Sequence, residues 1–402
     1  MQKIDVAVAN KKVGELFYEQ HEDRYIFNYT QKGDAISLIM PYRVSSYIHK
    51  NKLHPIFDMN MPEGYLFEIL KQYIAKEYGY LDDFLIFSYL CPNIQSRLIY
   101  ESWCTKSDVV SFDLEDILQN DTTDTFTNLV QTYLSKNAIG GVQPKSLAFL
   151  RDKESLLTKE YIVKTWGEEY ENLALNEYFC LKALKKAGVK TANVQLSKNK
   201  RFLVVERFNY DKKNEQFLGF EEVLTLLGKN KEQKYSGSYE SVAKIIYSVT
   251  TNKLESMQSY FAVVVMNYLL KNGDAHLKNF GILYSNDCKD IYFAPAYDIV
   301  NTVVYHHKDR PALTMFGKKI WFGKKELLKF GVQECFLSKK EVQRIYKRCI
   351  QSLQSTITEI EEYIQKDGSF YNIGSKMVDS LKLSLDAKSY KEMPDELVRN
   401  WR

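Results

Sequence analysis

The first part of the chain is dominated by apolar residues that alternate with polar or small ones. A period of two residues is typical of a strand with one buried face. The alternating runs cover residues 4–8, 13–17, 25–29 and 36–40. From Leu66 the apolar positions change to the spacing that gives a helix one buried face. Residues 1–118 are therefore expected to form an α+β module, a sheet packed against a helix.

A segment low in apolar residues, residues 118–128, is the best linker candidate in the chain. Residues 171–186 have helical spacing, and Gly188 follows as a residue that can end the helix in a left-handed conformation. The short runs with strand composition are residues 146–150, 161–166 and 202–208. We expect residues 128–210 to form a second, smaller unit with a sheet and one helix.

The remainder, residues 211–402, has mostly helical patterns. The longest apolar run, residues 260–270, fits a buried helix over residues 255–271. It is well short of the roughly 18 residues that a membrane span needs. Ser338 and Glu341 form a capping box, which opens a helix whose apolar positions keep helical spacing up to residue 364.

Composition narrows the function classes. The 402 residues are 45% hydrophobic and 26% charged, which is ordinary for a soluble globular protein of two or three domains. A net charge of +4 gives no strong field for direct binding of DNA or membranes. The six cysteines include no C-x-x-C pair, which argues against a zinc site or a disulfide framework. The first residues lack the apolar core of a signal peptide, so we expect a cytoplasmic protein.

The most informative stretch is the polar loop of residues 272–279, Asn-Gly-Asp-Ala-His-Leu-Lys-Asn. It places Asp274 five positions before Asn279, as protein kinase catalytic loops place a catalytic carboxylate and a magnesium-binding amide. Asn272 and Gly273 stand where those loops have His and Arg. Taken alone, the stretch is also explained by a turn in which Asp274 caps the residues that follow.

A second carboxylate, Asp298, follows the strand-like run of residues 291–293. Magnesium prefers carboxylate, amide and phosphate oxygens, so Asp298 and Asn279 could share one ion if their loops are neighbours. The alternative is a turn aspartate beside Pro295, which is common.

A glycine-rich stretch and a lysine precede this loop in the chain. Residues 140–145, Gly-Gly-Val-Gln-Pro-Lys, could let backbone amides approach phosphate oxygens. Lys164, 23 residues after Gly141, could bind the same phosphates from a strand. Glu177 is the candidate to hold Lys164, in competition with the glutamates at 168, 169 and 171. A simple Gly-Gly turn and a solvated edge lysine are the alternatives.

Five stretches together resemble HipA-type toxin kinases, in sequence and in order. They are residues 141–145 (Gly-Val-Gln-Pro-Lys), 161–164 (Tyr-Ile-Val-Lys), 205–208 (Val-Glu-Arg-Phe), 272–279 and 295–298 (Pro-Ala-Tyr-Asp). Residues 57–64, which end in Pro-Glu-Gly, resemble the N-terminal part of the same family, and residues 221–235 are similar to the region after its hinge. The similarity extends from about residue 3 to residue 365.

The resemblance implies an α+β, two-lobed protein-kinase-like fold. Residues 1–118 would be the N-terminal subdomain, 128–210 the small lobe with its glycine-rich loop, and 211–402 the mostly helical large lobe. ATP and Mg²⁺ would be the cofactors, and a serine or threonine of a protein, such as an aminoacyl-tRNA synthetase, the substrate. A HipB-like helix-turn-helix antitoxin would be the partner, with DNA reached only through it and no membrane involved.

The same resemblance implies roles for individual residues. Asp274 would be the catalytic base, Lys164 would bind phosphates, and Asn279 and Asp298 would hold Mg²⁺. The other nucleotide-site residues would be Gly140, Gly141, Val142, Gln143, Pro144 and Lys145 at the phosphates, Glu206, Arg207 and Phe208 at the adenine, and His276, Lys278 and Tyr297 along the site.

The positions just before the Gly-Val-Gln-Pro-Lys run depart from the family. Its members often carry a Ser-x-Ser sequence that is autophosphorylated, where this chain has Ala138 and Gly140. Neither residue can carry a phosphate, so self-inactivation at these positions is not expected. Ser135 and Ser146 are nearby substitutes, and regulation by a partner is the alternative.

Two other functions remain open. The loop also resembles the His-Gly-Asp-x-x-x-x-Asn loop of aminoglycoside phosphotransferases, which phosphorylate small molecules, but the N-terminal module argues against this class. A catalytically weak, nucleotide-binding co-repressor is the other possibility, and the intact polar residues at 164, 274, 279 and 298 argue against it.

Two further features have ordinary explanations. His306 and His307 make a weak metal candidate, because neighbouring side chains point in different directions and no third ligand is evident. The lysine pairs at 318–319, 324–325 and 339–340 fit a solvated face, and a weak DNA contact beside a DNA-binding partner is the functional alternative.

Overall fold

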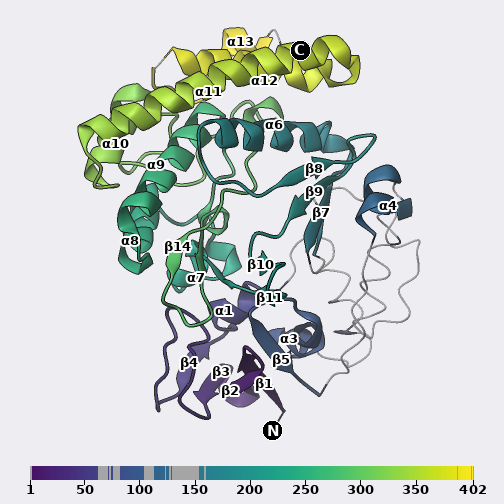
Figure 1. The fold of residues 1–402 in the computed structure, drawn as a ribbon, viewed down its shortest axis with the longest axis vertical. Helices are drawn as coiled ribbons and strands as arrows, with labels where there is room; N and C mark the ends of the chain where they lie inside the picture. The colour runs from purple at the N-terminus through teal and green to yellow at the C-terminus, as the bar shows by residue number, and fades with distance from the viewer. Residues whose placement is uncertain are drawn as a thin grey trace.

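The computed structural model has an N-terminal module at one end, a four-stranded sheet with one helix beside the centre, and a larger helical part at the other end (Figure 1). The described residues are 2–61, 71, 74–75, 82–103, 113–122, 124–125, 128, 154–157, 160–386, 388–399 and 401. Three expected elements lie outside these ranges wholly or almost wholly: the helix from Leu66, the glycine-rich stretch 140–145 and the strand 146–150.

The N-terminal module is a five-stranded antiparallel sheet in the order β4-β3-β2-β1-β5, with short helices packed on it. Its elements are β1 (Lys3–Val8), β2 (Lys11–Glu19), β3 (Arg24–Tyr29), β4 (Tyr47–Lys50), α1 (Pro55–Asp58), α3 (Asp83–Leu90) and β5 (Leu98–Glu101). The helix that follows, α4 (Leu114–Gln119), lies beside the small-lobe sheet instead (Figure 1). Ile4, Val6 and Val8 are fully buried on one face of β1, as their alternation predicts.

The prediction of a strand at residues 36–40 is wrong. This segment forms a turn closed by a single bridge between Ser37 and Met40, and the fourth strand is β4. Ile36 and Met40 are buried, but Ser37 is buried as well, because its hydroxyl binds the carboxylate of Glu221 in the large lobe. The segment therefore serves as a contact between module and lobe rather than as a sheet strand.

The small lobe is a four-stranded antiparallel sheet in the order β6-β7-β9-β8. Its elements are β6 (Glu154–Leu157), β7 (Tyr161–Thr165), α6 (Leu173–Lys186), β8 (Val194–Leu196) and β9 (Leu203–Glu206). Val163 and Val204 join the hydrophobic core of the N-terminal module, whereas Leu203 and Val205 pack on the opposite side with Ala174 of α6. The sheet is thus covered on both faces.

The helix of this lobe ends as its sequence predicts. Gly188 has a φ of 74°, and its amide donates to the carbonyl of Lys185. The next amide, that of Val189, donates to Leu184. This left-handed end satisfies carbonyls that the helix leaves without an internal partner.

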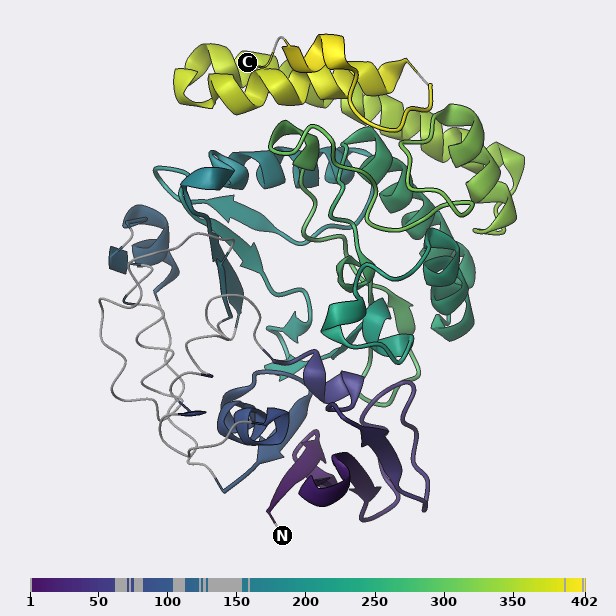
Figure 2. The same ribbon diagram turned by 180° about the vertical axis from the view of Figure 1, so that it is seen from behind.

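The large lobe is built around α9, whose residues 260–269 are all buried. The elements are β10 (Tyr210–Asp211), β11 (Gln216–Phe217), β12 (Gly219–Glu222), α7 (Val223–Leu226), α8 (Tyr239–Val249), α9 (Lys253–Leu269), β13 (Gly281–Tyr284), β14 (Ile291–Phe293), α10 (Lys324–Gln333), α11 (Lys339–Lys366), α12 (Tyr371–Leu385) and α13 (Asp395–Arg399). The long helix α11 begins with the expected capping box between Ser338 and Glu341. In both views α11, α12 and α13 cover the end of the molecule opposite the N-terminus (Figure 2).

None of the helices in the described ranges combines the length and the apolar character of a membrane span.

Candidate active site

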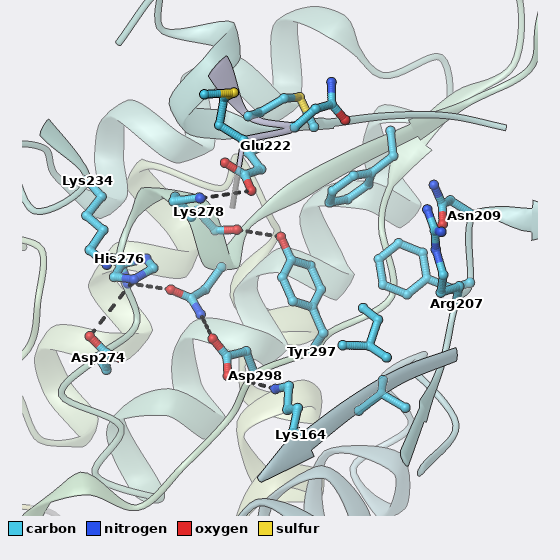
Figure 3. Close-up of a pocket in the computed structure, with 18 of the residues that line it drawn as sticks. Lys164, Arg207, Asn209, Glu222, Lys234, Asp274, His276, Lys278, Tyr297 and Asp298 are labelled. Atoms are coloured by element: carbon cyan, nitrogen blue, oxygen red, sulfur yellow. Dashed lines mark hydrogen bonds and ion pairs between the residues drawn. The ribbon is translucent and has the colours of Figure 1, made fainter. Parts of the chain in front are cut away.

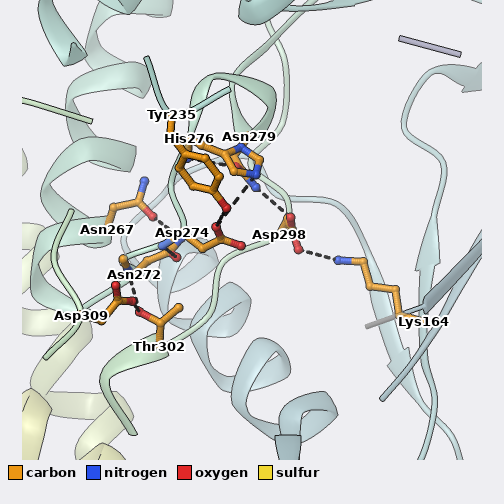
Figure 4. Close-up of polar contacts among 11 residues, drawn as sticks. Lys164, Tyr235, Asn267, Asn272, Asp274, His276, Asn279, Asp298, Thr302 and Asp309 are labelled. Atoms are coloured by element: carbon orange, nitrogen blue, oxygen red, sulfur yellow. Dashed lines mark hydrogen bonds and ion pairs between the residues drawn. The ribbon is translucent and has the colours of Figure 1, made fainter. Parts of the chain in front are cut away.

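The polar loop begins where α9 ends, so a buried helix fixes its position. Asn272 donates from its side-chain amide to Asn267 of α9 at 2.8 Å, and its own amide oxygen accepts from the backbone of Asp274 at 3.2 Å. The backbone of Gly273 donates to the hydroxyl of Thr302 at 2.8 Å. Both asparagines are buried, so these bonds fix the start of the loop against α9, and Figure 4 shows the contacts.

One continuous chain of polar contacts crosses the cleft, formed by Lys164, Glu177, Asp298 and Asn279. Figure 4 shows its part from Lys164 through Asp298 to Asn279, and Figure 3 shows Lys164 and Asp298 in the cavity. The Nζ atom of Lys164 lies 2.6 Å from Oε1 of Glu177 and 3.0 Å from Oδ1 of Asp298. The other oxygen of Asp298 accepts from the side-chain amide of Asn279 at 2.8 Å. The expected Lys164–Glu177 ion pair is therefore present, and the small lobe is joined to both loops of the large lobe.

The electrostatics keep Lys164 charged. Burial alone would lower the pKa of its ammonium, but the carboxylates of Asp298 and Glu177 outweigh that effect, and the pKa is raised. The side chain of Glu177 is only 2% exposed, whereas that of Asp298 is 39% exposed. Asp298 therefore faces the cleft, while Glu177 supports the lysine from inside.

Asp298 has a φ of 57°, the left-handed region that few residues other than glycine, asparagine and aspartate adopt. It follows Tyr297, whose hydroxyl donates to the backbone carbonyl of Lys278 at 2.5 Å. The tyrosine thus joins the Asp298 loop to the polar loop of residues 272–279, and the turned backbone points the carboxylate at Asn279 and Lys164.

His276 lies beside Asp274, with its Nε2 atom 4.0 Å from Oδ1 of the carboxylate. Burial lowers the pKa of the imidazole, so it is predominantly neutral at pH 7. Its backbone amide donates to the side-chain oxygen of Asn279 at 3.1 Å. His276 therefore lies next to both Asp274 and Asn279.

Three aromatic rings form a wall of the cleft: that of Phe208 just after β9, that of Phe220 in β12 and that of Tyr297 after β14. The rings of Phe208 and Tyr297 have centroids 5.6 Å apart, and that of Phe220 lies 5.4 Å from Phe208. The side chain of Glu206 binds Lys212 at 2.7 Å, and Arg207 donates to the backbone of Gln95 in the N-terminal module at 2.7 Å. Among Glu206, Arg207 and Phe208, it is therefore Phe208 that contributes a ring to this aromatic wall.

A cavity of about 1010 Å³ contains every predicted site residue that the structure describes. Its walls come from both lobes and from residues 56–61 and 93–98 of the N-terminal module. Lys278 lies within it with its Nζ atom 3.6 Å from Glu222 (Figure 3). Gly140, Gly141, Val142, Gln143, Pro144 and Lys145 lie outside the described residues, so their roles stay predictions.

The sequence of two regions matches known protein families. The model of the HipA-like C-terminal domain matches residues 137–357, more than half of the chain, and that of the HipA N-terminal domain matches residues 4–94. The chain belongs to the HipA family.

Individual HipA-family relatives match over part of their length. A "putative kinase" of Haemophilus influenzae is 32% identical over 185 residues, which is 42% of this chain and 53% of that protein. The serine/threonine-protein kinase toxin HipA of Shewanella oneidensis is 29% identical over 197 residues, 42% of this chain and 44% of that protein. The chain thus spans about half the length of the curated relatives that it matches.

A solved HipA structure has the same fold over nearly the whole chain. It is HipA of Shewanella oneidensis in complex with HipB and operator DNA, with a TM-score of 0.69 at 16% identity. The match covers 96% of this chain and 97% of that one. The architecture is therefore the α+β, two-lobed kinase-like fold of the HipA family.

The donor set of this HipA-family site fits a magnesium ion. Asp298 offers carboxylate oxygens to the cleft, and Asn279 beside it carries an amide oxygen, which in this structure accepts from the backbone of His276. Both are hard oxygen ligands of the kind that Mg²⁺ prefers. The ammonium of Lys164 beside them is suited to phosphate oxygens. The described residues thus fit ATP with Mg²⁺ rather than a metal bound by histidines or cysteines.

Three polar residues of this HipA-family site are not predicted by any motif in the sequence. Tyr235 donates its phenol hydroxyl to Oδ1 of Asp274 at 2.8 Å. Thr302 and Asp309, whose side chains are hydrogen-bonded to each other, support Gly273 from below (Figure 4). No spacing rule identifies them, because they approach the loop only in the folded chain.

Proposed function

We propose that this protein is an ATP- and Mg²⁺-dependent serine/threonine protein kinase that acts as the toxin of a toxin–antitoxin system. The observation that carries the proposal is the contact chain from Glu177 through Lys164 and Asp298 to Asn279, with Asp274 on the same loop. This is the polar set that phosphoryl transfer uses. The names of the relatives support serine/threonine specificity and the toxin role.

The chemistry follows from the positions of these groups. Bound ATP would supply the γ-phosphoryl group, with Mg²⁺ neutralising its charge. Lys164 would hold phosphate oxygens, while Asp298 and Asn279 would hold the metal. Asp274 would take the proton of an acceptor hydroxyl as that oxygen bonds to phosphorus and the bond to the departing ADP oxygen breaks.

The proposed partner is a HipB-like helix-turn-helix antitoxin, and the proposed substrate is a protein of translation such as an aminoacyl-tRNA synthetase. The support for the partner is the likeness to HipA crystallised with HipB and operator DNA. The small net charge fits a protein that reaches DNA through its partner rather than directly.

The test is transfer of radiolabelled phosphate from ATP in host-cell lysate, with the wild type and the Asp274→Ala variant compared. We expect label on serine or threonine of a few proteins, dependent on Mg²⁺ and reduced about 100-fold or more by Asp274→Ala. Asp287→Ala, at an exposed turn, is the matched control. Expression of the wild type should arrest growth, and the Asp274→Ala variant should not.

Other outcomes would replace the proposal. Label on a metabolite and on no protein would make the protein a small-molecule kinase. Tight binding of ATP and antitoxin without any transfer would make it a nucleotide-binding co-repressor. Equal toxicity of the Asp274→Ala variant would exclude catalysis as the cause of growth arrest.

A further inference from the structure

Tyr235 places a hydroxyl on the carboxylate that the proposed function uses as its base. Its Oη atom donates to Oδ1 of Asp274 at 2.8 Å. Its ring meets the imidazole of His276 edge-on, with centroids 5.2 Å apart and an interplanar angle of 81°. The residue is nevertheless 47% exposed, so burial in a hydrophobic core does not explain its position.

The segment of residues 229–236 that carries Tyr235 is bound to the catalytic loop by its backbone as well. The amide of Leu277 donates to the carbonyl of Lys234 at 3.1 Å. A short 3-10 helix at Lys231–Gln233, in which the backbone amide of Asn230 donates to the side-chain oxygen of Gln233 at 3.2 Å, gives the segment a fixed shape. Tyr235 is therefore held by an ordered segment rather than by a free loop.

The other side of the same segment is bound to the N-terminal module. Asp58 at the end of α1 accepts a hydrogen bond from the backbone of Lys231 at 3.3 Å. Lys52 forms an ion pair with Glu232 at 2.5 Å. Burial raises the pKa of the Asp58 carboxyl, which agrees with its position at a closed contact. The segment thus spans from the N-terminal module to the catalytic loop.

We propose that Tyr235 is a positioning residue for Asp274 and that the N-terminal module holds it in place. The proposal rests on the proposed kinase function. A hydrogen bond to one oxygen of a carboxylate fixes the direction in which the other oxygen points. Displacement of such a catalytic group by about 1 Å lowers the rate up to about 100-fold. Contact with the module through Asp58 and Lys52 then couples a surface distant from the phosphates to the rate of transfer.

The first test is Tyr235→Phe, which keeps the ring and removes only the hydroxyl. We expect kcat for phosphate transfer to fall roughly tenfold while the KM for ATP stays unchanged, because the ring that packs on His276 is kept and only the hydroxyl on Asp274 is lost. Amide hydrogen exchange of residues 272–279 should speed up in the same variant. Tyr247→Phe, another exposed tyrosine, is the matched control and should leave both quantities unchanged.

The second test asks whether the module acts through Tyr235. The Lys52→Ala/Asp58→Ala variant should lower kcat several-fold, and adding Tyr235→Phe should lower it little further, because all three changes disturb one path. Fully additive effects would overturn the coupling to the module. An unchanged kcat in Tyr235→Phe would overturn the positioning role.

Failure of the kinase proposal is separable from failure of this one. If the wild type transfers no phosphate to any acceptor, the proposed function fails, and the exchange measurement alone decides the role of Tyr235. Unchanged exchange of residues 272–279 in Tyr235→Phe would then overturn the positioning role, and faster exchange would support it.

Discussion

At the scale of single residues, Lys164 contacts two carboxylates, one of them buried and the other exposed to the cleft. Glu177 is almost fully buried, whereas Asp298 faces the cleft. A buried ion pair as a whole adds little to the stability of a protein compared with apolar residues in its place. Removal of one partner is costly, however, because the other charge is then buried without compensation. Lys164 therefore affects both the fold and the proposed chemistry.

We expect Lys164→Met to lower the free energy of unfolding by about 3 kcal/mol. Phosphate transfer should fall about 100-fold or more, because a preorganised charge at the phosphates is lost. Chemical denaturation and radiolabel transfer measure the two effects. The double variant Lys164→Met/Glu177→Gln should regain stability without regaining activity. Recovery of activity in the double variant would contradict a direct role of the lysine.

Lys271, next to the catalytic loop, is a buried amine of a different kind. It is 3% exposed and donates to the backbone carbonyl of Tyr268 at 2.8 Å, between the rings of Trp321 and Tyr390. Burial lowers the pKa of its ammonium from 10.5 to about 7. Between these two pH values the unfolded chain binds a proton that the folded chain does not, so this residue makes stability rise with pH.

We expect Lys271→Met to melt at a higher temperature than the wild type at pH 7, and this difference to shrink steadily up to pH 10. Methionine has similar length and carries no charge to bury. Thermal unfolding at several pH values measures the difference, with the exposed Lys340 replaced by methionine as control. A difference that stays constant over this range would show that Lys271 keeps its proton in the folded protein.

At the scale of elements, the polar loop of residues 272–279 depends on a glycine for steric reasons. A Cβ atom added at Gly273 would collide with Oδ2 of Asp309 and lie 2.8 Å from the hydroxyl of Thr302. Asp309 is itself held by that hydroxyl, so it cannot move aside without breaking the bond. The close approach, rather than an unusual φ, requires glycine at this position.

We expect Gly273→Ala to lower the free energy of unfolding by about 1–3 kcal/mol and to reduce phosphate transfer. The second change Asp309→Ala should restore part of the stability, because it removes the colliding oxygen. Gly368→Ala is the control: no atom of the described residues lies within 4 Å of a Cβ there. Urea denaturation decides the matter, and equal stability of Gly273→Ala and wild type would refute the packing argument.

Elements with local causes could be predicted from the sequence, and elements with distant causes could not. The capping box at Ser338 and the helix end at Gly188 depend on residues within a few positions, and both are present. The segment 36–40 has the alternation of a strand, but the partner of Ser37 lies 184 residues further along the chain. The sequence pattern therefore predicted that Ile36 and Met40 are buried, but not the conformation of their backbone.

The same limit applies within the site. Lys164, Asp274, Asn279 and Asp298 could be proposed because family motifs fix their spacing, and the structure brings them together. Tyr235 lies in a stretch with no chemical spacing rule, so only the folded chain shows its bond to Asp274.

At the scale of the whole molecule, Glu221 joins the N-terminal module to the large lobe. It is fully buried and accepts from the hydroxyl of Ser37 and the amide of Leu38 in the module and from the hydroxyl of Tyr284 in the lobe. Burial raises the pKa of this carboxyl, although the three donors oppose that rise. One side chain thus satisfies polar groups from both sides of the interface.

We expect Glu221→Ala to lower the free energy of unfolding by about 3 kcal/mol, because it leaves three buried donors without their acceptor. Trypsin should then cleave faster at Lys32 and Arg43, which flank the docked segment. Denaturation curves and limited proteolysis measure these effects, and Glu362→Ala on the exposed face of α11 is the control. Unchanged cleavage would show that the segment stays docked without the carboxylate.

The N-terminal module also contacts the small lobe, because the backbone of Gln95 accepts from Arg207 just after β9, and the segment that follows α4 binds another part of this lobe. Asp121 follows α4, is 1% exposed, and accepts from Ser197 and Asn199 in the turn between β8 and β9. The described parts therefore form a closed ring: small lobe, cleft, large lobe and module. In such a ring the two lobes cannot move apart unless one of these contacts breaks, so under the proposed kinase function we expect the rate of nucleotide release to depend partly on the outer module. Compounds that change this rate can then be sought among those that bind the outer module.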